Sequence, residues 1–421
     1  MLLSKNKKYQ NIFFFILSTY IIFNGGNSNL LIQINFILIS LFFLYCTKDK
    51  NYYSHFKFFY SKNKFSIFFY FLFLIYLIFQ TIPLPIEYLK FFSSFKYDYI
   101  TKFNNDISYS SISLSPSNSY FQILNFISLL ILIFIFEMIF YTDRHKNRLY
   151  LFLSLVGFLS ALFAIVFYLN GNPDFFFFYN SYYENSSTGF FINRTVFAIF
   201  LLFCLIASLE ILKNLDEIKI TRNQDNFFIK IYLKIFIIFI TIGIITSFSR
   251  IGNFLLLFSI FFYLVNEFFF SKNNNKTFRN IILLILFFDV VILGIYFGSS
   301  QLFDRFYFIK DELVGVNSSE VNISRIEIIK FGLKNFFDFK FFGYGAGSFE
   351  TLFKINFYNS NYLYANHAHS DFVEFIGEFG LVGLSLLTIS ILRLIFNNTK
   401  YNFINLIILS YLITLLIFDF S

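Results

Sequence analysis

The position of Arg250 between two apolar segments makes its charged side chain a candidate for catalysis or binding. Arg250 ends the stretch SFSR, residues 247–250, which separates two strongly apolar segments. Its guanidinium must therefore lie at or just below the surface of any membrane that these segments cross. A charge held at that depth is a candidate for function, and the alternative is an arginine that snorkels to lipid headgroups. Arg194, which ends the stretch FINR at residues 191–194, has a similar position and a weaker case.

Arg325 lies in a pattern that is typical of a helix start. Residues 324–327, SRIE, have the spacing of a capping box, and apolar residues recur behind them at helical intervals, namely Ile326, Ile329, Leu333 and Phe336. We predict a short amphipathic helix along the membrane surface, with Arg325 in its first turn. Unpaired N–H groups and the positive end of the helix dipole favour an anion there. An ordinary surface arginine is the alternative.

Two of the four histidines lie together in the stretch NHAHSD, residues 366–371, directly before an apolar segment. Histidine is a base of suitable pKa near neutral pH for deprotonating an acceptor hydroxyl. As a metal site, His367, His369 and Asp371 lack a convincing fourth ligand. In a third interpretation, either histidine caps a helix or packs at its start. We expect neither a metal ion nor a cofactor.

The glycine-rich stretch GYGAG, residues 343–347, predicts a tight turn. A phosphate-binding loop is the weaker interpretation because no strand precedes the glycines. The sequence contains neither a Ser-His-Asp order nor a paired-carboxylate motif in a recognisable context, so hydrolase chemistry has little support.

The elements that must position these residues are membrane-spanning helices. Of 421 residues, 57% are hydrophobic and only 14% are charged, which is unlike a soluble globular domain. Apolar runs of about 17 to 25 residues, the length that crosses a bilayer, recur from end to end. We predict an all-α integral membrane protein, a polytopic bundle forming a single domain over residues 1–421. The eleven predicted spans are 12–23, 29–45, 65–82, 119–141, 149–169, 195–212, 230–247, 251–270, 280–298, 374–396 and 402–420.

Charge placement predicts how the bundle is oriented. Twenty Lys and Arg residues fall in the loops on the side of the N-terminus, against five in the short loops of the other side. This positive-inside bias places the N-terminus in the cytoplasm and explains the net charge of +8 without a nucleic-acid partner. Two outer loops are long enough to hold structure, residues 83–118 and residues 299–373, and the second joins spans nine and ten.

The first span has a basic start, as a signal peptide has, but no small-residue cleavage site follows Phe23. We therefore expect it to be retained as a helix. Cys46 and Cys204 lie in or beside separate predicted spans, which suggests neither a disulfide nor a thiolate metal site.

Together these stretches resemble the O-antigen ligase and O-antigen polymerase family, also called the Wzy-type family. The most specific element is His369-Ser370, followed after nine residues by GLVG at 380–383, with Glu378 just before the glycines. The other matching stretches are QTIPLP at 80–85, ISLSP at 112–116, GFFINR at 189–194, SFSR at 247–250, Arg325 and the turn at 343–349. Members commonly have about twelve spans; either the natural protein is one span shorter or the sequence is truncated.

The resemblance implies a metal-independent glycosyltransferase of the bacterial inner membrane, with its active site in the periplasm. The donor would be a glycan on an undecaprenyl pyrophosphate carrier. Arg250 and Arg325 would bind the departing pyrophosphate, and His369 would take the proton from the acceptor hydroxyl. Second-rank candidates for positioning the substrate are Arg194, His367 and Glu378.

The sequence leaves the acceptor open. It could be lipid A core in lipopolysaccharide biosynthesis, another glycan repeat unit in a polymerase, or a protein hydroxyl in an O-oligosaccharyltransferase. A transporter of lipid-linked or small solutes is the alternative from another class, and it predicts polar residues and broken helices at mid-membrane depth. The buried polar candidates are scattered and mostly near helix ends: Glu137, Glu210, Lys234 and Asp289.

Overall fold

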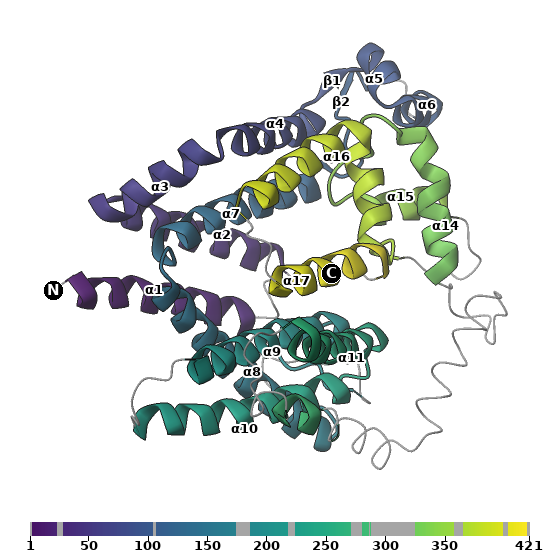
Figure 1. Ribbon diagram of the computed structural model, residues 1–421. Coiled ribbons are helices and arrows are strands. Elements are labelled where there is room, and N and C mark those ends of the chain that lie inside the picture. The colour runs from purple at the N-terminus through teal and green to yellow at the C-terminus, as the bar shows by residue number, and fades with distance from the viewer. Residues whose placement is uncertain are drawn as a thin grey trace.

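The protein is a bundle of long helices capped at one end by short ones (Figure 1). The computed structural model describes residues 2–22, 28–103, 107–173, 186–217, 224–270, 280–285, 287, 325–357, 365–398 and 403–418. The long helices are α1 (Leu2–Ile22), α2 (Asn29–Thr47), α4 (Lys64–Thr81), α7 (Pro116–Ile139), α8 (Asp143–Leu169), α9 (Arg194–Glu217), α10 (Gln224–Thr246), α11 (Arg250–Val265), α16 (Asp371–Asn398) and α17 (Phe403–Phe418). A π-helical turn, η3 (Asn266–Phe270), continues α11.

The all-α polytopic architecture predicted from the sequence is confirmed. Ten of the eleven predicted spans coincide with one of these long helices, and residues 280–285, the described start of the span at 280–298, are also helical. Eight helices in the described part of the chain are long and apolar enough to cross a membrane: α2, α4, α7, α8, α9, α10, α11 and α16. The remaining two of the ten are α1, which carries the basic N-terminal residues, and α17, which has 16 residues.

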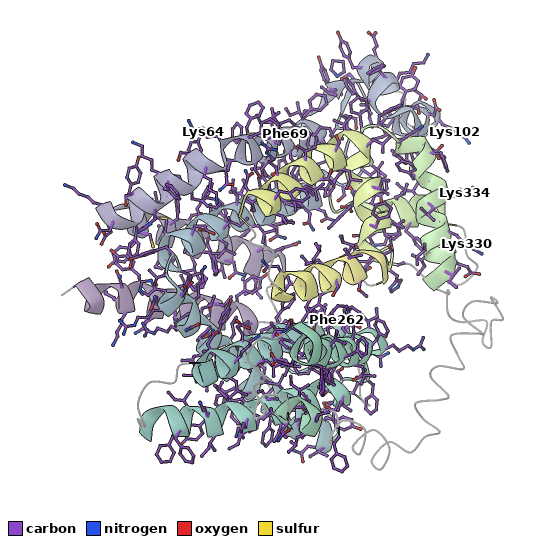
Figure 2. All side chains as sticks on the ribbon, viewed as in Figure 1. Lys64, Phe69, Lys102, Phe262, Lys330 and Lys334 are labelled. Carbon is purple, nitrogen blue, oxygen red and sulfur yellow. The ribbon has the colours of Figure 1, made fainter. Side chains whose placement is uncertain are left out.

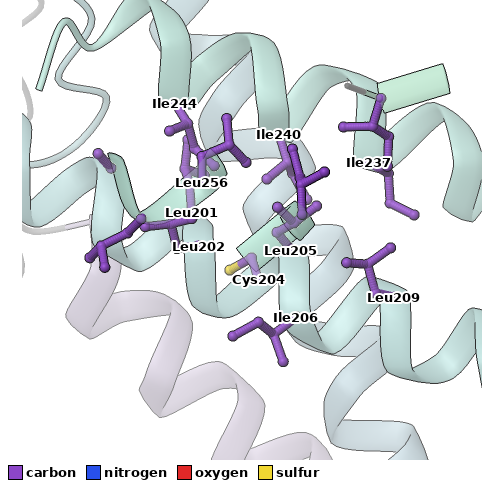
Figure 3. Packing of buried hydrophobic residues seen from close by; sticks show 14 of the residues in the cluster. Leu201, Leu202, Cys204, Leu205, Ile206, Leu209, Ile237, Ile240, Ile244 and Leu256 are labelled. Carbon is purple, nitrogen blue, oxygen red and sulfur yellow. The ribbon is translucent and has the colours of Figure 1, made fainter. Parts of the chain in front are cut away.

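The helices pack in two groups with α17 between them (Figure 1). One group is α8, α9, α10 and α11, where α9 is the central helix and close to three quarters of its apolar window is buried. Figure 3 shows the core of this group, in which Cys204 lies among leucines and isoleucines of α9, α10 and α11. The other group joins α4 and α7 to α16, and α2 to α7. Both cysteines are free and buried, as expected from their separate spans.

Short elements cover one end of the bundle, which we call the outer end because the predicted orientation places it outside. They are β1 (Leu84–Pro85), α5 (Ile86–Phe92), α6 (Ser94–Phe103), β2 (Tyr109–Ser110), α14 (Arg325–Phe336), η4 (Phe337–Phe339) and α15 (Phe349–Asn356). Strands β1 and β2 pair antiparallel, Leu84 opposite Ser110. Figure 2 shows Lys330 and Lys334 on α14 at the same end as Lys102 on α6.

The structure adds detail to two of the predicted segments. The inner loop around residues 48–64 contains a helix, α3 (Lys50–Lys62), whose N-cap Asp49 accepts from the backbone N–H of Asn51 at 3.0 Å. Helix α14 runs across the ends of the long helices, as predicted, and its buried side chains include Ile328, Phe331 and Asn335. Leu333 of the predicted apolar stripe is 45% exposed. Ile328 and Phe331 pack in one cluster with residues of α15 and α16, and Ile329 of the predicted stripe is partly buried against this cluster.

Candidate functional site

Helix α16 is broken at Gly380, and a loop from earlier in the chain fills the break. Gly380 has φ 62° and ψ −177°, so the helical hydrogen bonds are interrupted there. The backbone N–H groups of Tyr344 and Gly345 donate to the freed carbonyls of Gly377 and Glu378 at 3.0 and 3.1 Å. On the other side of the break, the N–H groups of Leu381 and Val382 donate to the carbonyls of Lys340 and Phe341 at 2.9 and 3.2 Å. The loop therefore replaces the missing turn of the helix.

Glycine is required at this junction because the two backbones touch. A Cβ atom on Gly343 would lie 2.2 Å from the carbonyl oxygen of Glu378, and a Cβ atom on Gly380 would lie 2.5 Å from the nitrogen of Gly343. Gly343, Gly345 and Gly347 all have positive φ, which confirms the predicted tight turn.

Two polar side chains of α4 complete the junction. Gln80 Nε2 donates to the carbonyl oxygens of Phe342 at 2.8 Å and Glu378 at 3.0 Å. The Tyr76 hydroxyl lies 2.7 and 2.8 Å from the carbonyl oxygens of Phe342 and Phe379. These groups hold the broken helix against α4 and give the freed carbonyls buried hydrogen-bond partners.

The stretch at residues 112–116 joins the same junction. The N–H of Leu114 donates to the Tyr344 carbonyl at 3.0 Å, and the hydroxyls of Ser113 and Ser348 lie 3.1 Å apart. Lys96 of α6 donates to the carbonyls of Ser111 and Ser113 at 2.7 and 2.5 Å. Burial lowers the pKa of Lys96 to about 8. Segments far apart in the sequence, at 80–85, 112–116, 343–349 and 378–383, thus form one scaffold.

Glu378 lies inside this scaffold. It is 4% exposed, and its carboxylate lies at the N-terminus of α15, where the backbone N–H of Phe349 donates to Oε1 at 3.4 Å. The N–H groups of Gly347 and Ser348 face the same carboxylate. A carboxylate at a helix N-terminus compensates unpaired backbone donors and the positive end of the helix dipole. The structure places Glu378 where it positions the loop and α15.

The two histidines lie on the loop that leads into α16, and Glu374, which sequence reasoning missed, holds His367 and the backbone of this loop. Glu374 Oε1 lies 3.0 Å from Nδ1 of His367, and Oε2 accepts from the backbone N–H of Ala368 at 2.9 Å. Burial alone would lower the pKa of His367. The hydrogen bond and charge of Glu374, with the charges of Asp371 and Glu350, outweigh burial and raise that pKa above its ordinary value.

His369 has a strained backbone. Its φ is 57°, in the left-handed region that few residues other than glycine adopt, and its Nδ1 atom is buried. The next residue, Ser370, is 4% exposed and its carbonyl accepts from the N–H of Glu374 at 3.0 Å, which starts α16. Strain of this kind is found where the surrounding structure fixes a functional side chain.

Arg194 and Arg250 begin two neighbouring helices, α9 and α11. Ser249 caps α11 by accepting from the N–H of Gly252 at 3.1 Å, and Phe248 makes the tight turn before it with φ 51°. A Cβ atom on Gly252 would lie 2.5 Å from Cβ of Ala198, so the first turns of α9 and α11 touch. Both arginines are therefore at adjacent helix starts.

The described contacts thus form two groups of predicted site residues, with α17 joining them. Arg194 and Arg250 belong to one group; His367, His369 and Glu378 belong to the other. Helix α17 bonds to the first group through Tyr411, whose hydroxyl hydrogen-bonds that of Ser259 on α11, and to the second through Leu416, whose carbonyl accepts from Ser370 Oγ at 3.4 Å.

Arg325 is the first residue of α14, and its side chain, like Ser324 of the expected capping box, lies outside the described residues. Two turns further along α14, Gly332 packs against the histidine loop: a Cβ atom there would lie 2.7 Å from Cγ1 of Val373 and 4.0 Å from Cβ of Ala368. Among the described residues, no group of three or more His, Cys, Asp or Glu side chains is arranged to hold a metal ion.

Comparison with known protein families matches residues 235–388 to the model described as O-antigen ligase. The chain carries an O-antigen ligase domain. The O-antigen ligase match begins in α10, ends in α16, and contains Arg250, Arg325, both histidines and the broken helix. This match supports the family predicted from the motifs, and the apolar helices support a multi-pass membrane protein. No curated protein matches the chain.

Proposed function

We propose that this protein transfers a glycan from an undecaprenyl pyrophosphate carrier to an acceptor hydroxyl at the outer face of the bacterial inner membrane. The observation that carries the proposal is the strained position of His369 beside the His367–Glu374 pair, within the O-antigen ligase domain. The acceptors considered are lipid A core, another glycan repeat unit and a protein hydroxyl, and the first is the one that the family description favours.

In the proposed reaction, the acceptor oxygen attacks the anomeric carbon while the bond from that carbon to the pyrophosphate breaks. The leaving pyrophosphate takes the electron pair, and the acceptor proton passes to His369. We assign the transfer to Nε2, because Nδ1 of His369 is buried. A single displacement inverts the configuration at the anomeric carbon.

The arginines supply the positive charge that the leaving group needs. Arg250 and Arg325 each stand at the first residue of a helix, where the dipole adds to the guanidinium charge. We assign these two to the pyrophosphate and Arg194, on the neighbouring helix start, to the carrier or the glycan. His367, whose pKa is raised, is assigned to positioning the substrate as a cation. Glu378 supports this arrangement by holding α15 from within the scaffold.

The broken helix also bears on the transporter alternative. A transporter uses a broken spanning helix to offer free backbone groups to its solute. In α16, the groups freed at Gly380 are taken by the loop at 340–345 and by Gln80 of α4. This occupancy favours a scaffold for an enzyme over a solute site.

The test is glycan transfer in proteoliposomes that contain a polyprenyl pyrophosphate oligosaccharide, with each acceptor class supplied in turn. His369→Gln and Arg250→Gln are compared with His55→Gln on α3 and Lys330→Gln on α14 as matched controls at equal membrane levels. We expect His369→Gln to reduce transfer by about 100-fold or more, as loss of a general base does, and the controls to keep the wild-type rate. Wild-type rates in His369→Gln would remove the proposed base.

A further inference from the structure

A pocket of about 490 Å³ opens at the inner end of the bundle, where the starts of α1 and α8 meet. Three cationic side chains line it, Lys7, Arg144 and Arg148, together with the amides of Asn6 and Gln10. The described lining contains no carboxylate. This pocket lies at the opposite end of the helices from the histidine loop (Figure 1) and takes no part in the proposed reaction.

The pocket is held in shape by its own hydrogen bonds. Arg148 donates to Oε1 of Gln10 at 2.6 Å and to Oδ1 of Asn11 at 2.8 Å, which fixes the guanidinium between α1 and α8. Gln10 is 2% exposed, yet its Nε2 donates to no group in the described part of the chain. A buried N–H donor without an acceptor destabilises the folded state. We therefore expect a ligand in the pocket to supply an acceptor for Gln10 Nε2.

A shallower depression adjoins this pocket along α1. A second pocket of about 430 Å³ shares Lys7 with the first and is lined further by Lys8, Ile12 and Phe15 of α1. Phe15 is 69% exposed on the outside of the bundle. A polar, cationic cavity that opens along an apolar helix face has the layout of a lipid headgroup and the chain attached to it.

We propose that this pocket binds the phosphate headgroup of an anionic phospholipid in the inner leaflet. The phosphate oxygens would accept from Arg144, Lys7 and Gln10 Nε2, and an acyl chain would lie along Ile12 and Phe15. Basic pockets between membrane helices bind anionic headgroups in this way, and the apolar continuation distinguishes a lipid from free phosphate.

The test measures lipid retention by native mass spectrometry and thermal stabilisation of the full-length protein in detergent. The probes are phosphatidylglycerol, phosphatidylcholine and inorganic phosphate. The double variant Lys7→Gln, Arg144→Gln removes two exposed pocket charges, and Lys57→Gln, Lys146→Gln removes two exposed inner-end charges that do not line the pocket. We expect phosphatidylglycerol to bind about 10- to 30-fold more weakly to the first variant only.

Three results would overturn the proposal: equal losses in both double variants, no loss in either, or inorganic phosphate binding as tightly as phosphatidylglycerol. The first would assign the effect to overall charge, and the last would make the site one for free anions. If the first double variant does not fold, Arg144→Gln alone is compared with Lys146→Gln, with an expected loss of about fivefold. Equal binding to these two single variants would count against the pocket.

Discussion

Glu374 holds the ring of His367 at 3.0 Å from Nδ1 and the backbone N–H of Ala368 at 2.9 Å, so one carboxylate fixes both a side chain and the loop that carries it. Because His369 follows directly on that loop, the position of the proposed base depends on a residue that does not touch the substrate. Glu374 is therefore a positioning residue in the proposed mechanism.

Replacing Glu374 tests this dependence. Glu374→Gln keeps the shape but removes the charge, so we expect the pKa of His367 to fall and transfer to decrease by about 10- to 100-fold through misplacement of the base. The pKa is measured by NMR of protein labelled at its four histidines. Glu350→Gln is the control, since Glu350 is the weakest of the carboxylates that act on His367 and also pairs with Lys354. An unchanged His367 pKa in Glu374→Gln would refute the assignment.

The raised pKa of His367 gives stability a defined pH dependence. A histidine whose pKa is higher in the folded state than in the unfolded state stabilises the fold fully below its unfolded pKa, and that contribution disappears as pH rises through its folded pKa. We therefore expect the wild type to lose stability relative to His367→Gln as pH rises from about 6 through the folded pKa. Thermal unfolding in detergent across this range measures the difference. A stability of the wild type that increases with pH relative to His367→Gln would contradict the prediction.

Alanine substitutions at Gly343 and Gly171 distinguish the cost of backbone strain from the cost of a steric clash. Both have positive φ, but a Cβ atom at Gly171 meets nothing within 4 Å, whereas one at Gly343 meets the backbone of Glu378 at 2.2 Å. Gly171→Ala should lower the free energy of unfolding by about 1–2 kcal/mol, because alanine disfavours the left-handed conformation. Gly343→Ala should lower it further, because the added methyl group also clashes with the backbone of Glu378. Thermal unfolding and proteolysis of the outer loop measure both. Equal effects would show that the junction yields to the added methyl group.

The lowered pKa of Lys96 predicts that the stability of the first outer loop rises with pH, whereas His367 predicts a loss of stability as pH rises. The Lys96 pKa of about 8 is lower than in the unfolded chain, so the folded state gives up the proton first and stability should rise as pH increases from about 8 toward 10. Hydrogen exchange at residues 107–115 reports this local stability. In Lys96→Met the rise should vanish and the exchange should be faster, because the carbonyls of Ser111 and Ser113 lose the hydrogen bonds that Lys96 donates. A rise that persists in this variant would assign it to another group.

Local sequence pattern was sufficient for the helices but not for their junctions. Apolar runs predicted the spans because the bilayer sets both their length and their composition. The break at Gly380 could not be read in the same way, since GLVG lies within an apolar run and its hydrogen-bond partners are Lys340 and Phe341, about 40 residues earlier. The glycines of the turn at 343–347 did predict its shape, because positive φ is a local property.

In the candidate site, too, local sequence predicted some features and long-range contacts determine the others. The motif order predicted the family, and the match over residues 235–388 bears out that part, whereas the roles of the individual site residues stay predictions. Glu374 was missed because it contacts His367 and Ala368 only after the loop folds back on the first turn of α16, and the sequence pattern does not show this fold.

The break in α16 also sets an order of assembly. An unbroken spanning helix satisfies its own backbone and enters the bilayer alone, but the carbonyls of Gly377 and Glu378 cannot face lipid without partners. Those partners come from the loop at 340–345 and from Gln80 of α4, which lies about 300 residues earlier in the chain. We therefore expect α16 to reach its final position only after the loop at 340–345 and α4 are in place, so that folding of this loop completes the insertion of the helix.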